Sequence, residues 1–153
     1  MKKLLLSLTL VAVFPGLAWA EGARNPRFVA LEVHLDSPQP VAAWQFELND
    51  RAAAAKVVGV EDGGHPAFRR APYYDRAAVA EGDSSRIMVA DYSLADAELL
   101  PVGQFRLARL HLMVRGESDF ELRLITAATP DGSVIDASVS IAEPNPAPQE
   151  RSP

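Results

Sequence analysis

The sequence predicts an all-β domain, an antiparallel jelly-roll β-sandwich of eight to nine strands. Apolar and polar side chains alternate with a period of two in several segments, which is typical of strands that bury one face. Turn-forming residues separate these segments about every 8–12 residues, the spacing expected of a sandwich. Helical patterns are confined to a few residues, so strands must supply most of the core.

The clearest alternation lies in residues 28–35 and 41–49, which we expect to form the first two strands. In the second segment Trp44 shares a face with apolar residues, while the opposite face is polar, so we expect Trp44 in the core. Pro38 and Pro40 fall between the two segments and predict a turn, because proline fixes φ and lacks an amide donor.

The middle of the chain carries mixed signals. Asp50 can cap a helix, and the alanines at 52–55 favour one helical turn before residues 56–60 return to β-type residues. From there the sequence predicts a loop followed by two strands, over residues 65–72, 73–80 and 85–92. Ser93 and Asp96 then resemble a capping box, which predicts a short helix that ends before Pro101.

The longest predicted strand, over residues 104–114, changes phase partway. A one-residue β-bulge near Ala108 would turn the apolar residues on both sides of it toward the core, namely Phe105, Leu107, Leu110, Leu112 and Val114. Two further strands are expected over residues 120–124 and 134–141, separated by a turn at Thr129-Pro130-Asp131-Gly132.

Residues 1–20 resemble a secretory signal peptide. Lys2 and Lys3 precede the apolar run 4–13, and Ala18 and Ala20 occupy the small-residue positions that signal peptidase reads. The run is shorter than the roughly 20 apolar residues of a membrane-spanning helix, although an uncleaved anchor is the alternative. We therefore expect an exported protein, periplasmic or extracellular, with no membrane span after signal cleavage. The organisation that follows is a signal peptide, one sandwich domain and a Pro-rich disordered tail, over residues 1–20, 21–142 and 143–153.

Composition removes several classes of function. The sequence contains no cysteine, which excludes thiol catalysis, zinc–thiolate sites and iron–sulfur clusters. Its net charge of −5 argues against nucleic acid as a partner, because phosphate contacts need a basic stripe. His34, His65 and His111 match no local metal motif, no loop collects the oxygens of a calcium site, and no G-x-S-x-G motif occurs. The sequence therefore predicts no metal, no cofactor and no catalytic residue.

The succession of these features resembles the cohesin domain, within the larger group of carbohydrate-binding-module-like sandwiches. The segments that carry the resemblance are 29–33, 41–48, the turn from Asp50 into 56–60, 87–91 and 103–110. The resemblance covers roughly residues 28–141 and implies a nine-stranded jelly roll that docks a protein or binds a sugar. Cohesins bind dockerins chiefly through one sheet face, which includes the strand corresponding to residues 87–91.

Candidate partner-binding residues gather around two adjacent tyrosines. Neighbouring residues on a strand point to opposite faces, so one of Tyr73 and Tyr74 should be exposed. Arginine and tyrosine are the residues that most often anchor interfaces. The predicted contact set is Arg69, Arg70, Tyr73, Tyr74, Met88, Asp91 and Tyr92.

The function expected from the sequence is an exported, non-catalytic binding module, with protein–protein docking of the cohesin type. Two alternatives stay open. One is a carbohydrate-binding module, because such modules use exposed aromatic platforms. The other is a hydrolase whose site is not visible in the sequence, because the spatial separation of two carboxylates decides glycosidase chemistry. The partner is thus a protein or a polysaccharide.

Overall fold

The computed structural model describes residues 25–143, which form eight strands, one short helix and one 3₁₀ turn. The strands are β1 (Arg27–Ser37), β2 (Ala43–Asp50), β3 (Ala55–Asp62), β4 (Tyr73–Tyr74), β5 (Arg86–Tyr92), β6 (Gly103–Val114), β7 (Phe120–Ala128) and β8 (Ser138–Ala142). The helix is α1 (Arg76–Glu81) and the 3₁₀ turn is η1 (Ala97–Leu99). The predicted signal peptide lies outside the described residues, as does the predicted tail beyond Glu143. No helix in the described range is long and apolar enough to cross a membrane.

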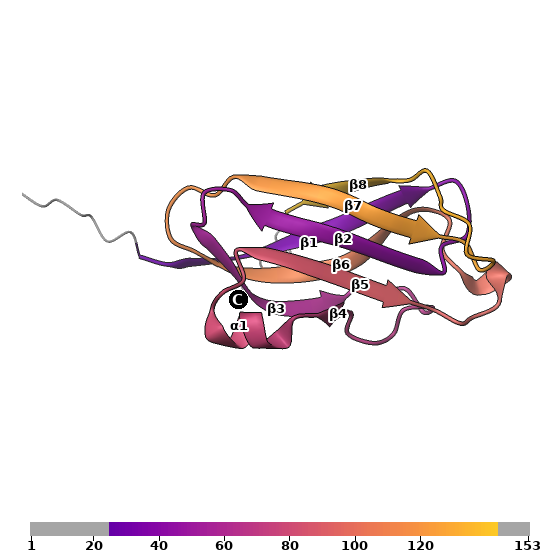
Figure 1. Cartoon of the computed structure of the whole chain (residues 1–153), viewed down its shortest axis with the longest axis horizontal. Helices are drawn as coiled ribbons and strands as arrows, with labels where there is room; N and C mark the ends of the chain where they lie inside the picture. The colour runs from indigo at the N-terminus through magenta and orange to yellow at the C-terminus, as the bar shows by residue number, and fades with distance from the viewer. Residues whose placement is uncertain (1–24, 144–153) are drawn as a thin grey trace, which may run out of the picture.

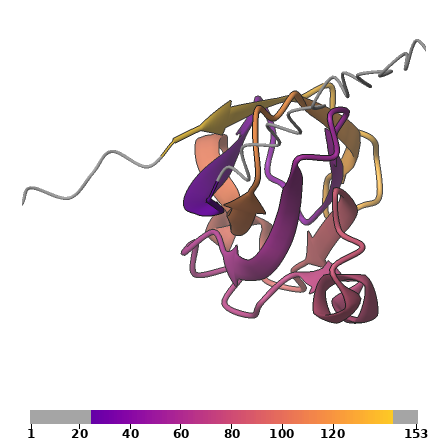
Figure 2. The same cartoon turned by 90° about the vertical axis from the view of Figure 1, so that its left-hand side faces the viewer.

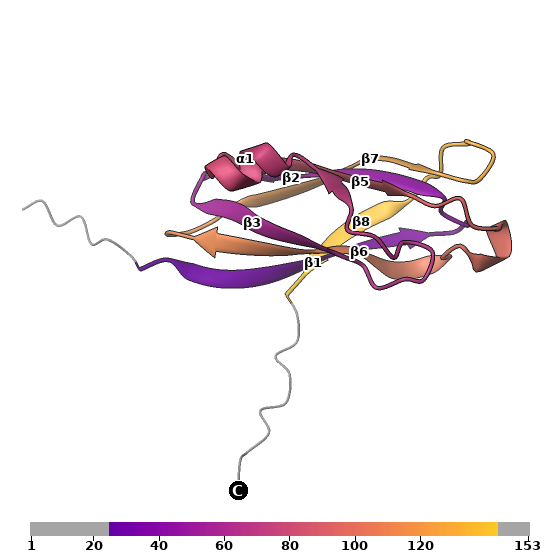
Figure 3. The same cartoon turned by 90° about the horizontal axis from the view of Figure 1, so that it is seen from below.

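Two antiparallel four-stranded sheets lie face to face, as Figures 1 and 3 show. Their strand orders are β3-β6-β1-β8 and β4-β5-β2-β7. The chain passes from one sheet to the other at every connection except the one from β4 to β5. Figure 2 shows α1 beside β3, at the margin of the sandwich. The predicted fold class, an antiparallel sandwich of eight to nine strands, is confirmed with eight.

The core lies between the sheets and takes the residues that alternation assigns to it. Trp44 is 2% exposed and stacks on Phe46, with 5.7 Å between ring centroids. The connection 65–72 is a loop, as predicted, and Phe68 from this loop packs edge-on against Trp44 and stacks on Phe105. The loop is therefore held to the core by one buried aromatic side chain, which positions the residues that follow it.

The β-bulge predicted in the longest strand is present in β6. Val33 of β1 pairs with Ala108, and His34 pairs with Arg106, so Leu107 is the extra residue between them. Leu107 is 1% exposed, and Leu110, Leu112 and Val114 after the bulge are buried as well. The phase change in the sequence is thus explained by one extra residue, which lets the apolar side chains of both halves of β6 face the core.

Two local predictions in the first half of the chain were wrong. The strand expected over 73–80 stops after Tyr74, and Asp75 caps α1 by accepting a hydrogen bond from the Ala78 N–H. The alanines after the cap favour a helix once the cap is made, and they leave the sheet. The helical turn expected after Asp50 is a tight turn without helix, because the Asp50 carboxylate accepts the Ala55 N–H and β3 starts there.

Two predictions in the second half also need correction. The helix expected after Ser93 is reduced to η1, because Ser93 accepts the Ala95 N–H and Asp96 makes no side-chain cap. The last strand runs over Ser138–Ala142 instead of 134–141. Val134 forms only an isolated bridge with Ala128, since the turn that starts at Thr129 is still closing there.

Candidate functional site

One row of side chains crosses all four strands of the β4-β5-β2-β7 sheet on its outer side. Tyr73 pairs with Ala90, Ala90 with Gln45, and Gln45 with Thr126. Residues two positions away along a strand point to the same side, which adds Ala43, Met88 and Tyr92. We call this surface the tyrosine face; it comprises Ala43, Gln45, Tyr73, Met88, Ala90, Tyr92 and Thr126.

Two parallel tyrosine rings dominate the tyrosine face. The ring centroids of Tyr73 and Tyr92 are 6.0 Å apart and the planes differ by 8°. The two side chains are 54% and 45% exposed, which is high for aromatic residues in the middle of a sheet surface. The guanidinium of Arg70 lies 5.8 Å from the Tyr73 centroid and 5.3 Å from the Tyr92 centroid, within the range of cation–π contacts.

A shallow hollow of about 530 Å³ runs beside these rings. Its lining residues are Ala43, Trp44, Gln45, Tyr73, Ala90, Asp91, Tyr92 and Thr126. The two alanines lower the surface between the larger side chains, so a partner side chain can reach the sheet backbone there. Much of the lining is apolar. Among the described residues, Asp91 is the one acidic residue that lines the hollow, and it is only 4% exposed. The hollow thus offers an apolar seat with aromatic walls.

Met88 lies at the edge of the tyrosine face, and an ion-pair cluster follows it along the sheet. Met88 is 50% exposed, and the Gln45 amide lies 2.9 Å from its sulfur. Beyond Met88, the Glu47 carboxylate accepts hydrogen bonds from Arg86 and, at 3.4 Å, from Arg123. The hydrogen bonds from Arg86 lower the pKa of Glu47. The sheet surface therefore changes from aromatic at the Tyr92 end to ion-paired charges around Glu47 at the other end.

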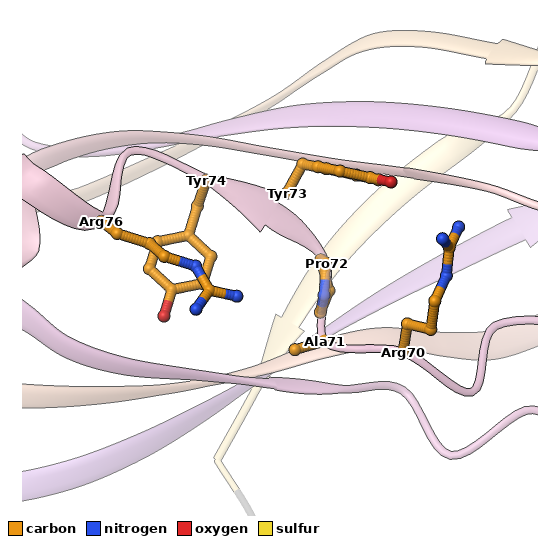
Figure 4. A pocket seen from close by; sticks show the side chains of 6 residues that line it. All are labelled: Arg70, Ala71, Pro72, Tyr73, Tyr74 and Arg76. Atoms are coloured by element: carbon orange, nitrogen blue, oxygen red, sulfur yellow. The ribbon is translucent and has the colours of Figure 1, made fainter.

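Three arginines border the tyrosine face near the β4 strand. Arg70 and Arg76 line a hollow of about 310 Å³ together with Ala71, Pro72, Tyr73 and Tyr74 (Figure 4). Arg69 and Arg70 line a second hollow of about 290 Å³, which also includes Asp91 and Tyr92. Arg70, Tyr73 and Tyr92 are each shared between two of the three hollows, so the three form one continuous surface.

The other two predicted contact residues, Tyr74 and Asp91, line these hollows but are less exposed. Tyr74 pairs with Val89 and is half-buried against the core, so Tyr73 is the exposed member of the adjacent pair. Asp91 accepts a hydrogen bond from the Tyr92 N–H, and burial raises the pKa of its carboxyl group. Tyr74 and Asp91 thus contribute less exposed surface to the hollows than Tyr73 and Tyr92 do.

Sequence reasoning missed several residues of this surface. Arg76 falls within the strand that the sequence predicts over residues 73–80, so it is absent from the predicted contact set, although it follows Tyr74 by only two positions. Gln45 and Ala43 lie in the polar phase of β2, and that phase was a usable signal for the outer face. Ala90 and Thr126 join them only through strand pairing, which one sequence does not reveal.

Histidines and carboxylates do not gather at the tyrosine face. Across residues 25–143, no group of three or more such side chains is placed to hold a metal ion. His34 and His111 lie near Glu32 and Glu61 respectively, on the other sheet. Their neighbours Arg106 and Arg109 both donate to Glu32 at 2.6 Å, and the Arg109 contact is the main reason why the pKa of Glu32 falls to about 2.

Comparison with known proteins shows little similarity in sequence. No protein-family model matches the chain, and no curated protein matches it either. Among solved structures, the chain is similar to the seventh ScaB type I cohesin from Pseudobacteroides cellulosolvens, with 14% sequence identity and a TM-score of 0.46. The similar region covers 71% of this chain and 73% of that one.

Proposed function

We propose that this chain is an exported binding module that docks another protein on the tyrosine face. The observation that carries the proposal is the exposure of Tyr73, Met88 and Tyr92, at 54%, 50% and 45%, on one sheet surface around a hollow floored by alanines. Large apolar side chains that are exposed together mark interaction sites on soluble domains. Tyrosine and arginine side chains are the usual anchors of such sites.

Binding is favoured over hydrolysis by the make-up of the hollow. Glycoside hydrolysis needs two carboxyl groups that flank the substrate. Asp91 is the only carboxylate in the lining of the tyrosine-face hollow, within the part of the chain that the structure describes, and its burial removes it from contact with a substrate. The arrangement supports recognition of a surface, not cleavage of a bond.

A polysaccharide is the second candidate partner, and one observation favours it. The parallel rings of Tyr73 and Tyr92 present flat aromatic surface on which a sugar ring could stack. A sugar also needs hydrogen-bond partners for its hydroxyl groups, and besides the two tyrosine hydroxyls the hollow supplies few, chiefly Gln45 and Thr126. The alanine floor suits an apolar side chain better, so a protein is the favoured partner.

Site-specific photo-crosslinking tests the docking proposal. A photoreactive amino acid replaces Met88 in the exported chain, and the cells that naturally produce it are irradiated. We expect one protein adduct, which is lost when Tyr73 and Tyr92 are both changed to Ser. The matched control carries the same photoreactive residue at Val58, which is 45% exposed on β3 in the opposite sheet, and should give no such adduct.

A glycan array with the same variants separates the two candidate partners. Binding of glycans that the Tyr73→Ser and Tyr92→Ser changes abolish, without any Met88 adduct, would show that the tyrosine face is a carbohydrate platform. Adducts that form equally at Met88 and Val58, and that survive both serine changes, would show that the face is not a docking surface.

A further inference from the structure

The arginines next to the tyrosine face differ from most of the others in forming no ion pair with a carboxylate of the described residues. Strand and turn arginines elsewhere form ion pairs with Glu32, Glu47 or Asp119: Arg51, Arg86, Arg106, Arg109 and Arg123. Arg69, Arg70 and Arg76 form no ion pair with any residue in the range 25–143. Arg27 and Arg115 form none in that range either, but they lie at the opposite end of the sandwich, where β1 begins and β6 has just ended.

Tyrosine rings hold two of these arginines in place. Arg70 lies against the rings of Tyr73 and Tyr92, and Arg76 lies 5.4 Å from the ring centroid of Tyr74. Figure 4 shows Arg70 and Arg76 on opposite sides of Pro72, each beside its tyrosine. A guanidinium packed on a ring by its flat face keeps N–H donors free at its edges. Neither guanidinium is held in an ion pair within residues 25–143, although the buried Asp91 carboxylate acts electrostatically on Arg70.

The hollow between Arg70 and Arg76 is suited to an anion. Its lining contains two arginines and two tyrosines and no acidic residue. The chain as a whole carries a net charge of −5, so this local positive charge is opposite in sign to the net charge of the chain. Arginine binds carboxylates with two parallel hydrogen bonds, which gives both strength and direction. Tyr73 also lines the apolar hollow, so an anion held here lies next to the alanine floor.

We propose that the protein partner presents an aspartate or glutamate side chain to Arg70 and Arg76, with an apolar residue beside it that fills the alanine hollow. This inference rests on the proposed docking function and names the chemistry of the partner segment. Arg69, at the second arginine-lined hollow, extends the positive surface, so a segment with more than one acid binds more tightly. Docking by this route weakens with salt, because exposed charges are screened beyond a Debye length of about 8–10 Å.

An acidic protein segment fits this surface better than an acidic polysaccharide. A uronate chain would bring a carboxylate at every sugar and hydroxyl groups between them. The neighbouring hollow has few polar side chains to receive those hydroxyls, since alanine and aromatic residues make up most of its lining. A peptide with an acid next to an apolar side chain matches both hollows at once.

Selection from a random peptide library tests the inference. Phage-displayed short peptides are panned on the purified full chain, and selected peptides are synthesised and titrated by fluorescence anisotropy at low and high salt. We expect enrichment of Asp or Glu beside an apolar residue, and an affinity that falls with salt. The double change Arg70→Gln and Arg76→Gln should weaken binding by about tenfold or more, as expected when charge-assisted hydrogen bonds are lost.

The matched control removes the same charge far from the tyrosine face. Arg51→Gln with Arg115→Gln, at the opposite end of the sandwich, should leave the affinity within about twofold, because the loss is then remote from the peptide. Selected peptides that lack acids, or that bind the Arg70/Arg76 variant equally well yet are lost with Tyr92→Ser, overturn the inference and leave the docking function standing. Arginine-dependent binding of oligogalacturonate, with no peptide selected, overturns both.

Discussion

The phenol ring of Tyr92 lies parallel to that of Tyr73, 6.0 Å away, although the two residues belong to different strands and α1 lies between them in sequence. Arg70 contacts both rings from the loop before β4. Its guanidinium, together with the Tyr73 hydroxyl, lowers the pKa of Tyr92, because both stabilise the phenolate. The tyrosine face therefore contains an exposed phenol whose pKa is lowered by a neighbouring arginine.

Removing the charge of Arg70 should raise the pKa of Tyr92 toward its ordinary value. An ultraviolet absorbance titration of the folded chain should show one phenol that ionises early, and this phase should move to higher pH in Arg70→Gln. Tyr92→Phe identifies the phenol, since that variant loses the same phase. Arg51→Gln serves as the control for a remote loss of charge. An early phase with the same midpoint in Arg70→Gln and in the unmodified chain would show that Arg70 does not act on Tyr92.

Protonation of Glu32 at low pH should make the fold less stable. Hydrogen bonds from Arg109, and from Arg106 and His34, lower the pKa of Glu32 from 4.5 to about 2, so the folded state favours the carboxylate. Stability from this group is complete above about pH 4.5 and is lost as the pH falls toward 2. Urea denaturation should show Glu32→Gln less stable by about 2–3 kcal/mol at neutral pH, with the difference vanishing near pH 2.

The control for Glu32 is Glu98→Gln, at an exposed position in η1. Its stability should follow that of the unmodified chain at every pH. A deficit of Glu32→Gln that stays constant from neutral pH to pH 2 would mean that packing, and not ionisation, explains the loss.

Asp50 should be essential for the turn between β2 and β3. Its carboxylate is buried and accepts hydrogen bonds from the backbone N–H groups of Ala52, Ala55 and Asp119, at 3.2, 2.6 and 2.7 Å. Asp50→Ala leaves these donors without that acceptor and should cost about 3 kcal/mol or more in the free energy of unfolding, measured by urea denaturation.

Asp62→Ala is the matched control for Asp50. Asp62 also accepts a backbone N–H in a turn, from Gly64 at 2.7 Å, but this bond is exposed to water. Water can replace it, so the loss should stay near 1 kcal/mol or below. Equal losses in the two variants would contradict the role assigned to burial.

Gly63 should tolerate no side chain, whereas Gly59 should accept one. A Cβ built on Gly63 would lie 1.8 Å from the Arg106 carbonyl oxygen, so the end of β3 and the backbone of β6 would have to separate. On Gly59 the nearest atom would be the His111 side chain at 3.6 Å, an ordinary contact. Thermal unfolding should show a clear fall in Tm for Gly63→Ala and little change for Gly59→Ala.

Neither glycine has a positive φ, so backbone conformation does not separate the two substitutions. A similar Tm for both variants would show that β6 can move away from Gly63 at little cost. Such movement would also loosen Arg106, whose guanidinium holds Glu32.

Several strands and the bulge could be predicted from the sequence, because positions that face the core are occupied by apolar residues. A strand with one buried face must alternate, so β1, β2 and the two halves of β6 could be recognised, and the phase change at Leu107 and Ala108 located the bulge. The segment after Tyr74 was predicted wrongly because Val79 favours a strand, whereas the alanines around it favour a helix. There, one hydrogen bond from the Ala78 N–H to Asp75 decided for a helix.

The sequence by itself determined which side chains are buried and which residue types could anchor a partner, because hydrophobicity and side-chain chemistry belong to each residue alone. It singled out Arg70, Tyr73 and Tyr92 but not their contact. Only the tertiary structure decided that Tyr73 and Tyr92 stack, that Tyr74 and Asp91 turn inward, and that Arg76 joins Arg70 around one hollow. Such proximity depends on the pairing of strands distant in sequence, and pairing is a property of the whole sheet.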